Sequence, residues 1–389
     1  MREAAFPIGA AATLAELEED PHPLLARLRE REPVSWLPAL GAWLVTRRDL
    51  ALAAMRDADT FTVDDPRFST GRVVGRSMLT TDGAEHDRHR DPFARGFRLD
   101  AVRERFAEAV VEETGRLLDA IEQSGRAELR RALAGPLAAA AALLALGLED
   151  ADAAEVLGWY DEIVASVTRL SAGDPAGPAG AEAFAALSAS IAPHVEELAP
   201  DLGSLTAEQA ISNAAVLMFG GIETTEAMIC NALLHLLSSP DQLALVEADR
   251  GLLGNAVEES LRLEPGAAVI DRYATRDTEL GGAPIRAREL VTLSLAGANR
   301  DPAVFPDPDR FDVRRENARL HLAFAQGPHV CIGMHLARLE THAALALALD
   351  RLPGLRLDPE RPSAPRGLVF RKPPELHVVW TPPAATLGS

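Results

Sequence analysis

A cysteine at the start of a helix is the most reactive group that the sequence presents. Cys331 lies in the segment Phe324-Ala-Gln-Gly-Pro-His-Val-Cys331-Ile-Gly333, and apolar residues at helical spacing follow it. Unpaired backbone N–H groups and the positive end of a helix dipole lower the pKa of a thiol there, so we expect a thiolate. Gly327 and Gly333 would let the backbone approach a flat ligand closely.

Two other interpretations of this cysteine start from the same residues. A lone cysteine in a cytosolic protein is usually a buried core residue. A zinc site is disfavoured, because His329, Cys331 and His335 supply three ligands without a fourth at suitable spacing. Cys230 is the only other cysteine, too few for a disulfide framework, and we expect it to pack in the core.

A second unusual segment, Met218-Phe-Gly220-Gly221-Ile-Glu223-Thr224-Thr225, lies in the middle of a long helical pattern. Each glycine there costs about 1 kcal/mol relative to alanine, and threonine is a weak helix former, so we expect the helix to kink or open. Close packing against another helix would explain the glycines but not the acid and the two hydroxyls beside them. Such a conflict between local preference and fold often marks a site.

The cysteine segment resembles the haem-binding signature of the cytochrome P450 family, with Ala325 in place of the commoner glycine. The resemblance implies that Cys331 is the axial thiolate ligand of a haem b iron. The residues of the loop that match the signature and would contact the cofactor are Phe324, Gly327, His329, Cys331 and Gly333.

The helical segment is similar to the oxygen-binding segment of the same family. Gly220, followed by Gly221, stands where alanine is frequent, and Glu223 stands where aspartate is commonest. The resemblance implies that both glycines lie beside the haem, that Thr224 holds water and oxygen, and that Glu223 feeds protons from solvent. Thr225 is expected to bond only the carbonyl of the preceding turn.

Charged residues elsewhere also match the family. Glu259 and Arg262 are three residues apart on a helix, which alone usually means a weak surface ion pair. The resemblance instead implies that they form a buried structural triad with Arg310. It also implies that four residues bind or neutralise the haem propionates: His86, Arg90, Arg272 and His329.

The elements that must position these residues are mostly helices. From about residue 100 onward, apolar residues recur at three- and four-residue spacing. A long helix is predicted from about Thr206, which has capping-box spacing with Gln209, to Leu237. Short strands are predicted at residues 34–37, 43–46, 269–272, 291–295 and 368–380. Residues 171–180 are predicted to form an irregular loop, because three glycines and two prolines exclude a regular element. Residues 181–197 are predicted to form a single helix, whereas members of the family usually have more helix before the long helix.

Length and composition fit one large domain covering residues 1–389, and the predicted elements make it mostly α with small peripheral sheets. The resemblance implies the triangular P450 fold, with the haem buried between the long helix and the helix after Cys331. The net charge of −19 disfavours nucleic acid and anionic membranes as main partners. There is no apolar run long enough for a signal peptide or membrane anchor, so we expect a cytoplasmic protein.

The function that follows is a haem-thiolate monooxygenase, an oxidoreductase that activates O2 with two externally supplied electrons. Soluble bacterial members imply a ferredoxin and a ferredoxin reductase as separate donors, and we expect a monomer. The donor should dock around residues 86–95, where charge reversal at Arg88 or Arg95 would test it. The substrate pocket should draw on residues 63–79, 163–170, 216–220, 267–270 and 368–370 and take a small, largely apolar substrate, in secondary metabolism.

Two rival functions stay open. A peroxide-driven peroxygenase on the same fold would not need the Glu223–Thr224 pair, and turnover with hydrogen peroxide alone would favour it. A haem-binding or gas-sensing protein without turnover is the rival from another class. Failure of every candidate substrate to change the iron spin state would favour that second rival.

Overall fold

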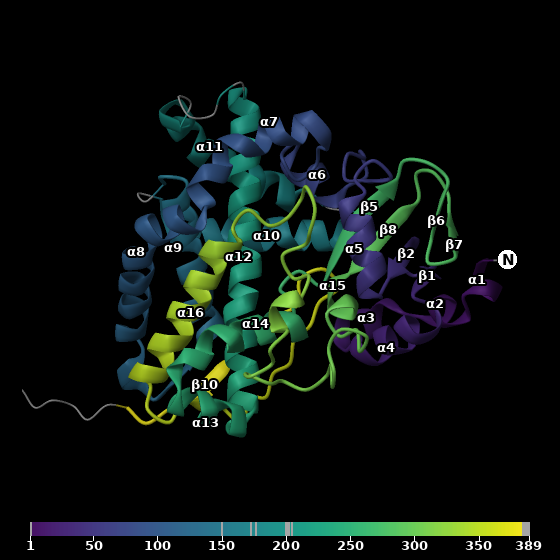
Figure 1. Ribbon diagram of the computed structural model, residues 1–389. Helices are drawn as coiled ribbons and strands as arrows, with labels where there is room; N and C mark the ends of the chain where they lie inside the picture. Colours follow the sequence, from purple (N-terminus) through teal and green to yellow (C-terminus); the bar gives the residue numbers. More distant parts are fainter. Residues whose placement is uncertain are drawn as a thin grey trace, which may run out of the picture.

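The computed structural model describes residues 2–148, 151–171, 173–175, 177–198, 203 and 205–382. Helices make up most of it (Figure 1). They are α1 (Arg2–Ala5), α2 (Pro7–Ala11), α3 (Leu14–Glu19), α4 (His22–Arg31), α5 (Arg48–Arg56), α6 (Ser69–Val74), α7 (Gly83–Ala94), α8 (Leu99–Asp119), α9 (Gly135–Ala145), α10 (Ala153–Ser171), α11 (Ala179–Leu198), α12 (Ala207–Ser238), α13 (Pro240–Ala248), α14 (Leu253–Leu263), α15 (Leu295–Ala298) and α16 (Met334–Arg351). No helix within these ranges is both long and apolar enough to cross a bilayer.

The strands are short and form three small sheets. The five-stranded sheet has the order β1-β2-β8-β5-β3, the second sheet β4-β10-β9, and β6 pairs with β7. Their bounds are β1 (Val34–Leu37), β2 (Ala42–Val45), β3 (Phe61–Thr62), β4 (Arg126–Glu128), β5 (Val269–Ala274), β6 (Thr278–Leu280), β7 (Ala283–Ile285), β8 (Leu290–Ser294), β9 (Arg356–Leu357) and β10 (His377–Val379). Four of the five predicted strands are confirmed, because β1, β2, β5 and β8 lie at the expected residues.

The fifth predicted strand, over residues 368–380, is mostly wrong. Only β10 near its end is a strand, and the earlier residues form a tight hairpin in which Arg366 and Lys372 exchange backbone hydrogen bonds of 3.0 and 3.3 Å. Gly367 makes this turn with φ +115°, a conformation open to glycine alone. The apolar tip of the hairpin faces the interior cavity described below, which explains why its sequence looked like that of a buried strand.

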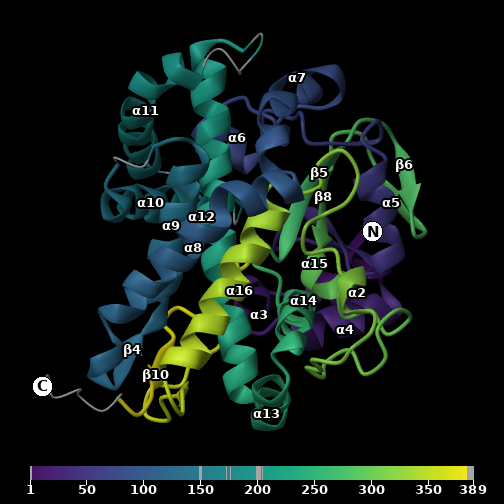
Figure 2. The same cartoon turned by 60° about the vertical axis from the view of Figure 1, so that its left-hand side comes forward.

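Helix α12 is the axis of the molecule. The Thr206 hydroxyl accepts from the Gln209 backbone N–H, and the Gln209 side chain accepts in return, so the predicted capping box starts the helix. Helices α9, α14 and α16 pack along it, and Figure 2 shows α16 crossing beside it. The helix predicted over residues 181–197 is α11, which begins earlier, at Ala179. Of the loop predicted over residues 171–180, residues 171, 179 and 180 are therefore helical, and residues 172 and 176 lie outside the described residues.

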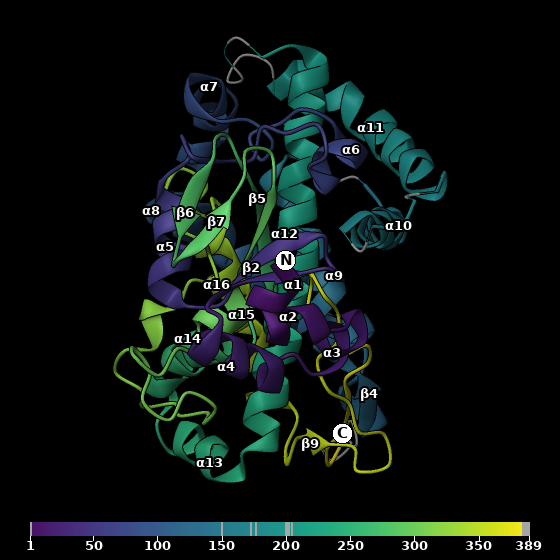
Figure 3. The same cartoon turned by 90° about the vertical axis from the view of Figure 1, so that its right-hand side faces the viewer.

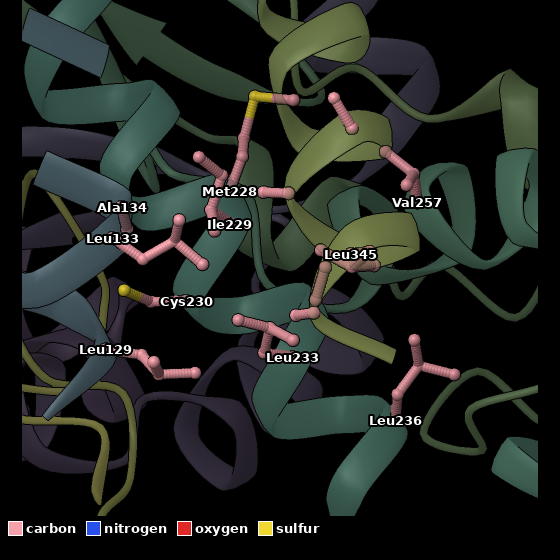
Figure 4. Close-up of a cluster of buried hydrophobic side chains, with 14 of the residues drawn as sticks. Leu129, Leu133, Ala134, Met228, Ile229, Cys230, Leu233, Leu236, Val257 and Leu345 are labelled. Atoms are coloured by element: carbon pink, nitrogen blue, oxygen red, sulfur yellow. The ribbon is translucent and has the colours of Figure 1, made fainter. Parts of the chain in front are cut away.

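The largest apolar core lies where α8, α12, α14 and α16 meet. Figure 4 shows Cys230 of α12 pointing toward Leu129 and Leu133, and this cysteine is fully buried. The prediction that Cys230 packs in the core is therefore confirmed. The five-stranded sheet and helices α1 to α5 form the other side of the molecule, as Figure 3 shows.

Candidate active site

The Cys331 loop is a closed turn held by its own backbone. The Cys331 N–H donates to the Phe324 carbonyl across 2.8 Å, and Gly333 is the N-cap of α16, as expected. Gly327 has φ +78°, and a Cβ there would lie 2.4 Å from the Met55 carbonyl oxygen, so only glycine fits. Ala325, which replaces the commoner glycine, also has a positive φ of 56°.

The Cys331 thiol has accessible surface, but that surface faces an interior cavity. Burial raises the pKa of the Cys331 thiol above its ordinary value, while the Gly333 N–H, Arg90 and Arg338 oppose the rise. The prediction of a lowered pKa from the helix start alone is therefore wrong for the thiol without a metal. The loss of hydration outweighs the N–H groups and the nearby arginines.

The glycine-acid-threonine segment remains α-helical, so α12 does not open there. The Thr224 hydroxyl donates to the Gly220 carbonyl across 2.5 Å. This is the bond to the preceding turn that we had expected from Thr225. A Cβ added to Gly220 would meet nothing within 4 Å, whereas one on Gly221 would touch Ala142 of α9 at 3.7 Å. Gly220 therefore leaves the helix surface open, and Gly221 lies against a helix.

A cavity of about 310 Å³ lies between α12 and the Cys331 loop. Its wall is largely apolar, and each of the five predicted pocket segments contributes to it. From α12 come Gly220, Gly221, Thr224 and Thr225, and from the loop come Phe324, His329, Cys331 and Gly333. The cysteine and the threonine that the sequence singled out thus face one space.

The four predicted propionate ligands lie near one another but bind differently. Arg90 donates to the Val330 carbonyl at 2.7 Å, and a ring nitrogen of His86 lies 3.2 Å from the Pro328 carbonyl. Both residues of α7 therefore hold the cysteine loop. His329 pairs with Asp82 at 2.7 Å and has a lowered pKa, because burial outweighs that carboxylate. Arg90, Arg272 and His329 line the cavity.

Arg272 provides the test of whether this cavity fits a haem. Its side chain is 4% exposed and donates to the Asp271 carbonyl, and it makes no ion pair among the described residues. Burial lowers the pKa of Arg272 to about 10, so a buried anion beside it would be stabilised. The cavity offers one thiol, open space at Gly220 and Gly333, and cations beside an apolar wall. These features match haem, a flat iron complex that carries two anionic propionates.

The structural triad is present with a different second arginine. Arg262 binds both carboxylate oxygens of Glu259 at 2.7 and 2.8 Å, and Arg315 completes the group at 2.9 Å. Arg310 was the wrong prediction. It lies in a turn where its carbonyl accepts from Arg262 and Arg315, and the residue is exposed. Position along the sequence alone could not distinguish an inward carbonyl from an inward side chain.

Glu223 does not pair with Thr224. Its carboxylate lies 2.7 Å from the ammonium of Lys372, which also binds Glu226. Burial raises the pKa of Glu223, and Lys372 opposes this rise. Lys372 was not predicted from the sequence, because it lies far from Glu223 along the chain.

Two further residues near the site were also missed. Arg338 of α16 stacks on the Phe324 ring at 4.4 Å and binds Glu258 at 2.7 Å, which supports the loop from below. Glu340 lines the cavity, and its Oε2 has no hydrogen-bond partner among the described residues. Burial raises the pKa of Glu340 well above its ordinary value. An acid on the apolar face of α16, one turn from Leu336 and Ala343, was the signal for it.

Comparison with known proteins agrees with this geometry. The family model described as Cytochrome P450 matches residues 185–378. The chain is 36% identical to cytochrome P450 monooxygenase PikC of Streptomyces venezuelae, covering 87% of this chain and 85% of the relative. It is also 36% identical to nocardicin C N-oxygenase of Nocardia uniformis subsp. tsuyamanensis, covering 93% and 96%.

A solved structure, that of CalO2, superposes with a TM-score of 0.85 at 29% identity and covers 95% of this chain and 99% of that one. One relative is named a monooxygenase and the other an N-oxygenase, and each match covers most of this chain. The fold, the cysteine loop and the cavity are those that such a function needs. The chain therefore belongs to the cytochrome P450 family and is a haem-iron oxidoreductase that incorporates oxygen into its substrate.

Proposed function

We propose that this chain, as one domain, is a ferredoxin-dependent haem b monooxygenase that oxidises a small, largely apolar compound in secondary metabolism. The observation that carries the proposal is that Cys331 and Thr224 line one cavity of about 310 Å³. Haem b bound there supplies a redox-active iron that takes up electrons and activates O2.

The chain's own residues hold the cofactor in this proposal. Cys331 would hold the iron as a thiolate, and the Phe324 carbonyl and Arg90 fix the loop that presents it. Arg272 and His329 would hold the propionates, whose charge would neutralise the buried guanidinium. The Glu259–Arg262–Arg315 triad stabilises the fold around the site.

Proton delivery is assigned to Thr224 and Glu223. Thr224 faces the cavity, where its hydroxyl can exchange the Gly220 carbonyl for a water molecule and pass on a proton. Glu223 lies one residue earlier and takes protons from solvent. An intact acid and alcohol favour a monooxygenase over a peroxygenase, because peroxide needs no such delivery.

The electron donor is proposed to dock on the side of the molecule nearest Cys331. Arg88 is a poor reporter of that surface, since it binds Glu85 and Gln209. Arg95, Arg98 and Arg103 are exposed, and Arg103 lies near His335 of α16. A ferredoxin with an acidic surface would complement this group, with its reductase as a separate protein and the P450 as a monomer.

Substrate class follows from the cavity wall. Side chains such as Phe68, Val216, Phe219, Ile270 and Phe370 are apolar, and Gly220 leaves space beside the helix. A compound with an apolar ring or chain fits this wall. One of the two relatives is named a monooxygenase, and the other is named for its substrate as nocardicin C N-oxygenase, which supports a substrate from secondary metabolism.

The test is the absorption spectrum of the dithionite-reduced protein under carbon monoxide. A strongly red-shifted Soret band is expected, because Cys331 would hold the iron as a cysteinate. An ordinary band would exclude thiolate ligation, and the absence of a band would exclude haem. Turnover with hydrogen peroxide but not with ferredoxin and NAD(P)H would replace the monooxygenase by a peroxygenase.

A further inference from the structure

One residue type occurs once in the chain. Of 39 basic Lys and Arg residues, only Lys372 is a lysine. It is 9% exposed, and its ammonium contacts the carboxylates of Glu223 and Glu226 on α12. Arginine would bind one carboxylate in a planar fork, whereas the compact ammonium directs its three donors toward separate acceptors. The one lysine thus lies where one cation is shared between two carboxylates.

The backbone holds Lys372 in place. It closes the 366–372 hairpin, and the preceding Arg371 is anchored to Glu264 at 2.8 Å, while the Asn231 amide donates to the Arg371 carbonyl at 2.9 Å. At the tip of the hairpin, Phe370 meets Phe219 of α12 edge to face with ring centres 5.5 Å apart. The cation is therefore fixed by the base of the hairpin, while the tip faces the cavity.

A second cation completes the group. Arg130 binds Glu226 at 3.0 Å and lies 4.0 Å from Asp161, whose side chain is 46% exposed. The side chains of Arg130, Glu226, Lys372 and Glu223 are 16%, 4%, 10% and 8% exposed, so all four are largely buried, whereas Asp161 beside Arg130 reaches the surface. Two buried carboxylates thus face two cations, and Glu226 keeps Arg130 even when Lys372 is removed.

We propose that Lys372 is a positioning residue for proton delivery: its ammonium keeps Glu223 ionised and on the side of α12 away from Thr224. After Glu223 leaves Lys372, its carboxylate takes up a proton from solvent and passes it to Thr224. This inference rests on the proposed function in its catalytic part. The charge state of Glu223 is a separate matter that can be measured without turnover.

The surrounding charges determine what removal of Lys372 does. Burial raises the pKa of Glu223, with Glu226 adding to the rise and Lys372 and Arg130 opposing it. Among the described residues, further titratable groups near this cluster are Cys230, Glu128 and Asp161. Without Lys372, the largest opposing cause is lost, so the pKa of Glu223 should rise further.

Infrared spectroscopy of the haem-loaded protein tests the charge state. Lys372→Met should gain the carbonyl stretch of a protonated carboxylic acid at neutral pH, and the Glu223→Gln/Lys372→Met double variant should lack the gained band. Lys372→Arg keeps the charge and should match the parent. A Lys372→Met spectrum equal to the parent, or a gained band that survives Glu223→Gln, would overturn the proposal.

A second measurement needs no change at Lys372, in case its variants fail to fold. Protein made with side-chain ¹³C/¹⁵N-labelled lysine has a single labelled side chain, so its NMR signal reports on this ammonium alone. Glu223→Gln and Glu226→Gln should each move the signal, since both carboxylates contact it. A signal that ignores Glu223→Gln would show that the pair does not form in solution.

Turnover tests the catalytic part. Product formed per NAD(P)H should fall several-fold in Lys372→Met and become dependent on pH near neutrality, and Lys372→Arg should restore most of it. A loss unaffected by Lys372→Arg and independent of pH would reduce Lys372 to a structural role. If the carbon monoxide spectrum lacks the thiolate band in the parent, the proposed function fails, but the infrared and NMR results still decide the Glu223–Lys372 pair.

Discussion

Arg315 and Glu259 form an ion pair of 2.9 Å inside the protein, and Arg310, five residues earlier, contributes only its carbonyl. Removing Arg315 leaves Glu259 with Arg262 as its remaining cation and deprives the Pro306 and Asp307 carbonyls of a charged donor. Arg315→Ala should therefore lower the free energy of unfolding by about 1.5–3 kcal/mol, the range for hydrogen bonds to a charged group. Urea denaturation measures the change.

Arg310→Ala is the matched control for that substitution. The Arg310 residue is exposed, so its removal should change stability by no more than about 0.5 kcal/mol. Equal losses in the two variants would mean that the side chains of Arg310 and Arg315 share the triad in solution.

Gly327 offers a test of the cysteine loop. Alanine there would have both a positive φ of 78° and a contact of 2.4 Å with the Met55 carbonyl oxygen. Gly147 has a similar φ of 67° with nothing within 4 Å, so Gly147→Ala should cost only the conformational strain of about 1–2 kcal/mol. Gly327→Ala should cost more and weaken haem retention. Thermal unfolding of both variants and the haem content of each protein check this.

The sequence predicted best what depends on local spacing. The capping box of α12, the start of α16 after Gly333 and the apolar pocket segments follow from periodicity and from short motifs. Contacts between distant residues were missed. Lys372 meets Glu223 because a hairpin folds back on α12, and Arg315 replaces Arg310 because of how a turn directs its side chains. The pKa of Cys331 was mispredicted because burial depends on the whole fold.

Thr224→Ala should separate oxygen activation from haem binding. The Thr224 hydroxyl bonds the Gly220 carbonyl and faces the cavity, so its loss should leave the haem in place. The delivery of protons should suffer, and reducing equivalents should then leak as hydrogen peroxide. Product and peroxide formed per NAD(P)H measure the effect. Thr224→Ser should recover much of the coupling, and unchanged coupling in Thr224→Ala would contradict the assignment.

Glu264 should account for part of the acid sensitivity. Burial alone would raise the pKa of Glu264, but His22 and Arg371 hold it at about 2, below its ordinary 4.5. A carboxyl with a depressed pKa stabilises the fold above its unfolded pKa, and this stabilisation is lost as pH falls from 4.5 through about 2. The free energy of unfolding should fall over that window in the parent and less steeply in Glu264→Gln. Parallel slopes would contradict the assignment.

Electron transfer should depend on the arginines near Cys331. Arg103 is exposed and lies close enough to His335 to influence its charge, and Leu99, one turn earlier on α8, is 45% exposed. A basic group beside an exposed apolar side chain suits a transient partner of opposite charge.

Arg103→Glu should raise the Kd for the ferredoxin donor about tenfold, with the largest effect at low ionic strength, because salt screens the repulsion. Arg286→Glu is the control, since Arg286 follows β7 on the other side of the molecule and is also exposed (Figure 1). Plasmon resonance at two salt concentrations measures both variants. Equal weakening by the two substitutions would mean that net charge alone controls binding, and no weakening by Arg103→Glu would move the docking surface elsewhere.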